Sequence, residues 1–199
     1  MELKEILKTH LQEASSILND FINNDEYLNS VTEAAETIIT SLSNGNKIIS
    51  AGNGGSMCDA MHFAEELSGR YRDNREALAA VSISDPSHIT CVGNDYGFDQ
   101  IFSRYLDAIG NDGDVFFGIT TSGNSDNITR AIVTAKRKGM KVVILTSDRP
   151  ESDVRLLFSH LIDNTILTPV NKYADRTQEL HIKIIHSLID MIERQLGMK

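Results

Sequence analysis

The first forty-five residues carry apolar side chains at helical spacing. Between residues 3 and 21 these side chains recur every three or four positions, and a second series runs from residue 25 to residue 42, where Ser43-Asn44-Gly45 ends it. This period predicts two amphipathic helices. We expect them either to cover the body of the protein or to pack against another subunit, and we favour the subunit interface.

From residue 46 onward, short apolar runs alternate with helical patterns. The apolar runs predict strands at residues 46–51, 77–83, 114–120, 141–146 and 160–167. The helical patterns lie at residues 57–67, 99–109, 126–138, 151–158 and 173–196. This alternation is typical of a parallel, doubly wound sheet. The predicted fold class is therefore α/β, with residues 1–199 forming a single domain and residues 1–45 a helical extension of it.

The composition narrows the classes of partner. With 199 residues and a formal net charge of −9, the chain lacks the basic surface that nucleic acids and anionic membranes require. No apolar run reaches the roughly 18 residues that span a bilayer. The two cysteines, Cys58 and Cys91, are more typical of a reducing compartment than of a disulfide framework. We therefore expect a cytoplasmic enzyme with no nucleic-acid or membrane partner.

A glycine-rich turn follows the first predicted strand. This turn, Gly-Asn-Gly-Gly-Ser at 52–56, leads directly into a helix for which Ser56 is a natural cap. Free backbone N–H groups at such a helix start attract anions. His62 and Glu66 share one face of this helix and offer a base or a pair of ligands. Alone, these features also fit a turn without a ligand and a His–Glu pair on the surface.

The third predicted strand ends in a hydroxyl-rich turn, Thr-Thr-Ser-Gly-Asn-Ser at 120–125. A helix begins directly after it, so hydroxyls and free N–H groups can together surround a phosphate. The alternative is a capping turn without a ligand. Both turns lack the Gly-Lys-Ser/Thr of nucleotide-hydrolysing loops, and the glycines at 52–55 lack the spacing of a dinucleotide fingerprint. We therefore set aside nucleotide hydrolysis, NAD and FAD.

Two further segments offer polar groups. Residues 84–95 are expected to form a loop whose end, Asn94-Asp95, either holds sugar hydroxyls or stops a turn or helix. Basic and aromatic side chains follow the 57–67 helix and form either a solvated loop or a phosphate clamp. They are Arg70, Tyr71, Arg72 and Arg75.

The last predicted helix carries polar side chains on a mostly apolar background. Asp175, Gln178, His181 and His186 stand among leucines and isoleucines, and polar groups on a buried helix need a partner. Gln178 and His186 are eight residues apart, about 80° around the helix axis, so both can face one pocket. Spacing alone does not choose between His181 and His186, because a core histidine is the usual alternative.

Together these segments resemble the sugar isomerase (SIS) domain family over nearly the full length of the chain. The matching pieces are GNGGS at 52–56, DAMHFAEELSGRYR at 59–72, SHITCVGNDYGF at 87–98, TTSGNS at 120–125 and ADRTQELHIKIIH at 174–186. The resemblance implies a three-layer sandwich, with a five-stranded parallel sheet between helices and two N-terminal helices, that assembles as a homotetramer. It also implies an isomerase that converts sedoheptulose 7-phosphate to D-glycero-D-manno-heptose 7-phosphate, the first step towards the heptose of lipopolysaccharide core.

The resemblance implies roles for individual residues as well. One zinc ion per subunit would be held by His62, Glu66, Gln178 and His186, with Glu66 and His186 also catalytic; this selects His186 over His181. The residues implied in substrate binding are Asn53, Gly54, Gly55, Ser56, Glu66, Arg70, Asn94, Asp95, Thr120, Thr121, Ser122, Ser125, Asp175 and Gln178.

A rival interpretation belongs to another functional class. Some proteins of this fold bind a replication-initiator partner and catalyse nothing. Those relatives lack the second glutamate of the 57–67 helix and the last histidine, whereas Glu66 and His186 are both present here. The acid–base pair therefore favours the enzyme.

Overall fold

The computed structural model describes residues 2–198. Within them a five-stranded parallel sheet has the order β2-β1-β3-β4-β5. The strands are β1 (Ile48–Gly52), β2 (Ala80–Ser82), β3 (Val115–Thr120), β4 (Lys141–Ser147) and β5 (Asn164–Thr168). The α-helices are α1 (Leu3–Ile22), α2 (Asp25–Ser43), α3 (Gly55–Ser68), α4 (Pro86–Asp95), α5 (Ile101–Ile109), α6 (Asp126–Arg137), α7 (Asp153–Leu156) and α8 (Ala174–Gln195). Two 3₁₀ turns complete the described chain, η1 (Phe98–Gln100) and η2 (Ser159–Leu161).

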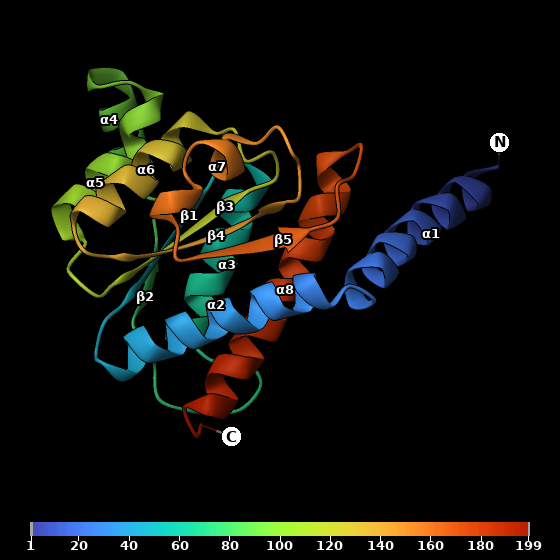
Figure 1. Ribbon diagram of the computed structural model, residues 1–199, viewed down its shortest axis with the longest axis horizontal. Coiled ribbons are helices and arrows are strands. Elements are labelled where there is room, and N and C mark those ends of the chain that lie inside the picture. The colour runs from blue at the N-terminus through green and yellow to red at the C-terminus, as the bar shows by residue number, and fades with distance from the viewer. Residues whose placement is uncertain (1, 199) are drawn as a thin grey trace.

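The sheet lies between two helical layers, as Figure 1 shows. One face of the sheet packs against α2, α3 and α8, and the other packs against α5 and α6, with α4 and α7 beside them. Strands β1 and β3 are buried throughout, because both faces of a parallel sheet are covered. The three-layer α/β fold predicted from the sequence is therefore confirmed.

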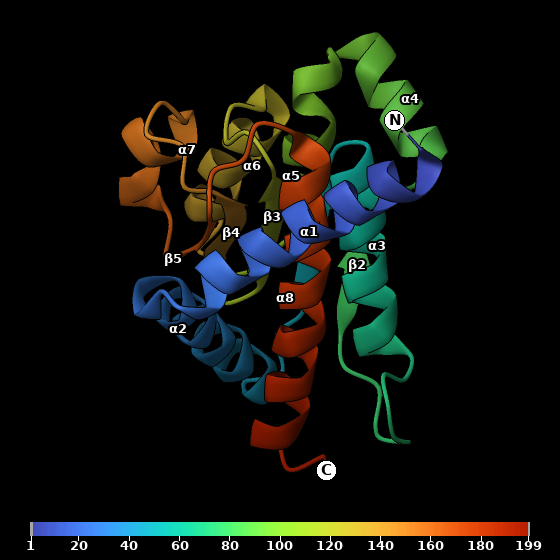
Figure 2. The same ribbon diagram turned by 90° about the vertical axis from the view of Figure 1, so that its right-hand side faces the viewer.

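Helix α1 extends from the body (Figure 1), and its second half crosses α8 (Figure 2). Ile17 and Phe21 are buried, whereas Leu3 and Leu11 on the first half are 84% and 62% exposed. Arg176, at the start of α8, binds this helix through Glu13. The leucines on the first half of the apolar face of α1 are therefore left exposed, whereas its second half packs against the body.

The prediction of a loop at residues 84–95 is wrong, because residues 86–95 form helix α4. The Asp85 side chain caps the helix by accepting from the backbone N–H of His88 at 2.8 Å, and Pro86 stands in its first turn. Val92 is buried. An Asp-Pro start followed by an apolar stripe was present in the sequence, so this helix was predictable.

Other differences are small and concern the ends of elements. Helix α3 begins at Gly55 with Gly54 at its N-cap, so Ser56 lies inside the first turn and is not the cap. Strand β5 starts at Asn164, four residues after the predicted start, because residues 159–161 form a 3₁₀ turn. In residues 2–198, no helix is long and apolar enough to cross a membrane.

Arg75 does not belong to a solvated patch or a phosphate clamp. Its side chain is 2% exposed and its Nε donates to the buried carboxylate of Glu193, on α8, at 2.8 Å. The remaining guanidinium N–H groups donate to the carbonyls of Glu66, Leu67, Gly69 and Glu76. Arg75 thus binds the last carbonyls of α3, which have no partner inside the helix, and joins α3 to α8.

Replacing Arg75 by methionine tests this role. The variant keeps much of the side-chain volume but removes the cation that faces a buried carboxylate, so the free energy of unfolding should fall by about 3–5 kcal/mol. Adding Glu193→Gln should restore part of the loss, because the buried charge is then gone. Urea denaturation measures both effects, and a loss below about 1 kcal/mol for Arg75→Met would contradict the assignment.

Candidate active site

The candidate site lies where the order of the strands reverses. Strands β1 and β3 are neighbours, and Gly52 pairs with Ile119 at their carboxyl ends. The chain leaves β1 for α3 on one face of the sheet and leaves β3 for α6 on the other. A crevice lies between the two turns, lined by Asn53 on one side and by Asn124, Ser125 and Asn127 on the other. This is where open α/β sheets bind ligands.

The β1–α3 turn depends on two glycines. Gly54 has φ +55° and ψ −120°, a conformation that side chains rarely adopt. A Cβ on Gly52 would lie 2.4 Å from the carbonyl oxygen of Ser56. The tight turn places the start of α3 directly after β1, and the N–H groups of Ser56 and Met57 there donate to the carbonyls of Asn53 and Gly54.

The β3–α6 turn gathers hydroxyl groups around a helix start. The Thr120 hydroxyl contacts that of Ser125 at 3.2 Å and accepts from the backbone N–H of Gly123 at 3.2 Å. The Ser122 hydroxyl accepts from the N–H of Asn124. Ser125 is the N-cap of α6, so the free N–H groups of the helix stand beside these hydroxyls. Neutral donors and the helix dipole suit a phosphate here.

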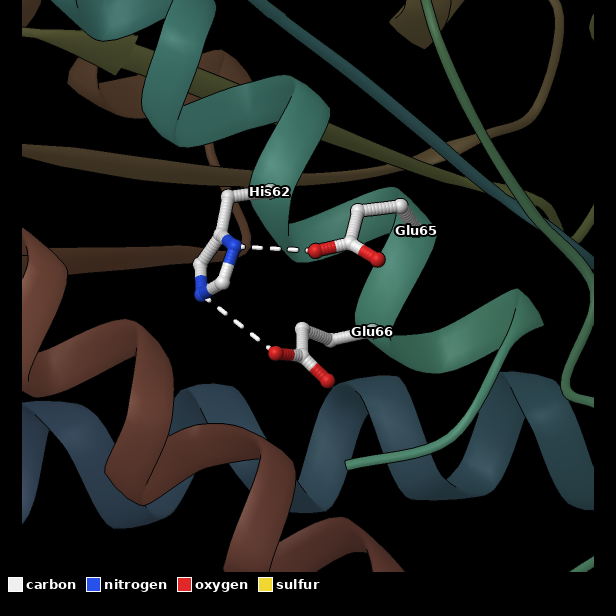
Figure 3. Close-up of side chains that lie close together, drawn as sticks. All are labelled: His62, Glu65 and Glu66. Carbon is white, nitrogen blue, oxygen red and sulfur yellow. Dashed lines mark ion pairs between the residues drawn. The ribbon is translucent and has the colours of Figure 1, made fainter. Parts of the chain in front are cut away.

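Helix α3 carries a cluster of titratable side chains, His62, Glu65 and Glu66 (Figure 3). Nδ1 of His62 lies 3.0 Å from Oε1 of Glu65, and Nε2 of His62 lies 3.7 Å from Oε1 of Glu66. From α8, Nε2 of His186 approaches Nε2 of His62 to 2.9 Å. The structure thus brings His62, Glu66 and His186 together. The spacing of His62 and Glu66 predicted their shared helix face, and the family resemblance selected His186.

The surroundings of His186 favour its neutral form. Partial burial lowers the pKa of His186, nearby His62 lowers it further, and Glu66 opposes the shift. The Tyr71 ring stacks on the imidazole, with centroids 5.7 Å apart and planes at 29°. A neutral imidazole offers one N–H and one lone pair, so His186 can both give and accept a proton.

Gln178 and His181 occupy different surroundings on α8. The Gln178 amide packs against Gly55, where a Cβ would lie 2.3 Å from its Oε1, and its Nε2 donates to Asp59 at 3.4 Å. The Gln178 side chain, which extends from α8, therefore contacts α3 about one turn before His62. His181 is fully buried, and burial lowers its pKa to about 3. His186, and not His181, faces the cluster.

The remaining residues of the predicted site lie in several places. Asn94 and Asp95 stand exposed in the last turn of α4, where the Asn94 amide donates to Asp95 at 2.8 Å. Arg70 follows α3 and is exposed, and Asp175 is exposed in the first turn of α8. These four side chains join no hydrogen-bond network with Glu66 or His186 within the described residues.

Sequence reasoning missed Glu65 and Asn127. Glu65 follows directly from its position three residues after His62, a spacing that places both on one helix face. Asn127 is 3% exposed and its amide bonds that of Asn53, 74 residues earlier in the chain. No pattern of neighbouring residues in the sequence predicts a pair at that separation.

The donor set at the cluster fits zinc. Ligands held at 2.0–2.1 Å in a tetrahedral site lie about 3.3 Å apart, and the contacts from Nε2 of His62 to His186 and Glu66, 2.9 and 3.7 Å, bracket that separation. Two imidazoles and a carboxylate are ligands that zinc takes. Glu65, on the second ring nitrogen of His62, is placed like the carboxylates that orient metal-binding histidines.

Comparison with known proteins adds independent support. Among curated proteins, the phosphoheptose isomerase of Cytophaga hutchinsonii is 55% identical over 194 residues, which cover 98% of this chain and 99% of that protein. The phosphoheptose isomerase of Vibrio cholerae is 48% identical and covers 98% of this chain and 99% of its own length.

Solved structures agree with these relatives. The phosphoheptose isomerase GmhA from Neisseria gonorrhoeae superposes with a TM-score of 0.87 at 36% identity, covering 97% of this chain and 100% of that chain. The family model for the SIS domain matches residues 9–147. The chain therefore belongs to the SIS domain family and, within it, to the group of phosphoheptose isomerases.

Proposed function

We propose that this chain is an aldose–ketose isomerase that converts sedoheptulose 7-phosphate to D-glycero-D-manno-heptose 7-phosphate through a cis-enediol. The observation that carries the proposal is the meeting of Glu66 and His186, from two different helices, around His62. Relatives of about half identity over nearly the full chain bear the name phosphoheptose isomerase. The reaction supplies the first intermediate of heptose synthesis for lipopolysaccharide core, and we place it in the cytoplasm.

The reaction requires two acid–base groups. A carbonyl moves from C2 to C1 when a proton leaves C1, a proton returns to C2, and another passes between the two oxygens. Glu66, whose side chain is 17% exposed, takes the carbon-bound proton and returns it to C2. His186, neutral at pH 7, transfers the proton between O1 and O2 and assists opening of the sugar ring.

The substrate is held at its other end by its phosphate. The hydroxyls of Thr120, Ser122 and Ser125 and the helix start of α6 bind the phosphate oxygens. Asn94, Asp95 and Asp175 bind the sugar hydroxyls once the sugar has entered the crevice. This division places binding at one turn and chemistry at the α3–α8 contact, so phosphate affinity and turnover are separable by mutation.

We further propose that the active protein is a homotetramer with one zinc per subunit. His62, Glu66, Gln178 and His186 would hold the ion, which would supply a Lewis acid beside the enediol oxygens. Leu3, 84% exposed on α1, belongs to the uncovered stripe that supports a subunit interface.

The phosphate assignment predicts the effect of removing single hydroxyls. Ser122→Ala and Ser125→Ala should each weaken substrate binding by about 1–3 kcal/mol, because each removes one phosphate donor from an otherwise intact turn. Steady-state kinetics measure the rise in KM. Thr40→Ala, which removes an exposed hydroxyl from α2, is the matched control and should leave KM unchanged. An unchanged KM in both serine variants would place the phosphate elsewhere.

The acid–base assignment predicts a loss of turnover without an equal loss of binding. Glu66→Gln keeps the size of the side chain but removes the basic oxygen, so kcat should fall at least ~10²-fold. His186→Asn should also lower kcat, and the double variant should lose less than the product of the single losses. Glu76→Gln, a change of an exposed side chain, is the control. Because the proton held on Glu66 exchanges with solvent, the wild-type product formed in deuterated water should carry deuterium at C2, at least in part.

Near wild-type turnover by Glu66→Gln would refute the assignment of the base. Product formation from sedoheptulose 7-phosphate, followed by chromatography of the two sugar phosphates, tests the reaction itself.

Metal content and mass test the two remaining proposals. Elemental analysis of the purified chain should find one zinc per subunit, and His62→Ala should lower zinc affinity beyond the ~10²-fold typical of losing a supporting residue. His160→Ala, which changes an exposed histidine of η2, should bind zinc normally. Light scattering should give the mass of four chains. A His62→Ala variant that binds zinc as tightly as the wild type would contradict the zinc proposal. A wild-type chain with the mass of a monomer would contradict the tetramer proposal.

A further inference from the structure

A reciprocal pair of hydrogen bonds joins the two turns that flank the crevice. Nδ2 of Asn53 donates to Oδ1 of Asn127 at 2.9 Å, and Nδ2 of Asn127 donates to Oδ1 of Asn53 at 2.8 Å. Asn127 is 3% exposed, and Asn53 is half-buried. Each amide donates one N–H to the other amide and accepts one N–H from it, so the pair fixes the orientation of both side chains.

The position of this pair gives it a consequence for the site. Strands β1 and β3 are hydrogen-bonded along their length, but after Gly52 and Thr120 the chain departs to opposite faces of the sheet. The backbone ladder therefore stops where the two turns begin. Among the side-chain hydrogen bonds of residues 2–198, the Asn53–Asn127 pair is the one that joins these turns.

We propose that Asn127 is a positioning residue for the isomerisation, acting through Asn53 to fix the distance between the phosphate-binding turn and helix α3. The inference rests on the proposed function. Asn127 belongs to the first turn of α6, beside the hydroxyls of 120–125, and Asn53 belongs to the turn that starts α3, the helix of His62 and Glu66.

The chemistry needs this distance to be fixed. A sugar phosphate held by its phosphate reaches Glu66 through an acyclic carbon chain with many rotatable bonds. A misplacement of about 1 Å between a bound substrate and a catalytic group costs on the order of 10²-fold in rate. Two short hydrogen bonds that include a buried amide hold the turns far more rigidly than solvated loops would.

The pair also specifies what Asn53 does. The resemblance implies a substrate contact for Asn53, but one N–H and one lone pair of its amide are already used by Asn127. The same amide retains a second N–H and a second lone pair for the sugar. Asn127 therefore also determines which of these groups faces the crevice.

The variant Asn127→Ala separates this role from phosphate binding. We expect kcat/KM for sedoheptulose 7-phosphate to fall by about 10²-fold, while the inhibition constant of inorganic phosphate stays within roughly twofold, because the hydroxyls and N–H groups of the 120–125 turn remain. Thr129→Val is the matched control: Thr129 is a buried residue of the same helix whose hydroxyl bonds the carbonyl of Asp126. It should change neither constant.

A double variant tests whether the two asparagines act as one unit. Asn53→Ala combined with Asn127→Ala should lose no more than the worse single variant, because each removes the same link. Three results would overturn the proposal: wild-type kcat/KM in Asn127→Ala, multiplying losses in the double variant, or a parallel loss of phosphate inhibition.

A measurement without substrate keeps this inference distinct from the proposed function. If the wild-type chain fails to isomerise the sugar, the function is wrong, and the positioning role is judged by hydrogen exchange. Asn127→Ala should speed exchange of the amides at 52–56 but not those of β4, and Thr129→Val should speed neither. Unchanged exchange at 52–56 would overturn the link.

Discussion

The buried ion pair between Arg75 and Glu193 is the interaction on which the candidate site depends. The guanidinium takes the last carbonyls of α3, including that of Glu66, and joins them to α8. The proposed acid–base pair is divided between these same two helices, because Glu66 lies on α3 and His186 on α8. A buried pair of this kind adds little net stability over apolar residues, but breaking it is costly. Its value here is that it sets the relative position of two helix ends.

The second constraint is the reversal of strand order at β1 and β3. It sends the two following helices to opposite faces and leaves the turns before them on either side of one crevice. An acidic chain with a net charge of −9 can therefore bind a phosphate through neutral donors at a helix start, without a basic surface. The long-range field of the protein opposes the ligand, and local hydrogen bonds outweigh it at short range.

The layers of the fold and much of the candidate site could be predicted from the sequence, and single elements show why. Continuous apolar runs such as β3 indicate strands covered on both faces, and the spacing of His62 and Glu66 fixes a shared helix face. Residues 86–95 form helix α4 where a loop was predicted, although Asp85 and Pro86 are residues typical of a helix start. The segment also contains Ser, Asn, Asp and Gly, which are typical of loops. Arg75 could not be predicted as buried, because its acceptors are backbone carbonyls and a carboxylate more than a hundred residues away. The contact of Asn127 could not be predicted either, because its partner Asn53 lies 74 residues earlier in the chain.

The hydrogen bonds around His62 determine which nitrogen of His186 is available for chemistry. When His62 is neutral with its proton on Nδ1, 3.0 Å from the Glu65 carboxylate, its Nε2 carries the lone pair and accepts from Nε2 of His186, 2.9 Å away. The lone pair of His186 then resides on Nδ1, which can accept a proton from a substrate oxygen. If Nε2 of both histidines held a metal ion instead, Nδ1 of His186 would carry the proton and would have to donate it before it could accept another. The same side chain would therefore begin the transfer between the two oxygens as an acceptor without the ion and as a donor with it, while the second carboxylate oxygen of Glu66 would be available to the carbon-bound proton in both cases.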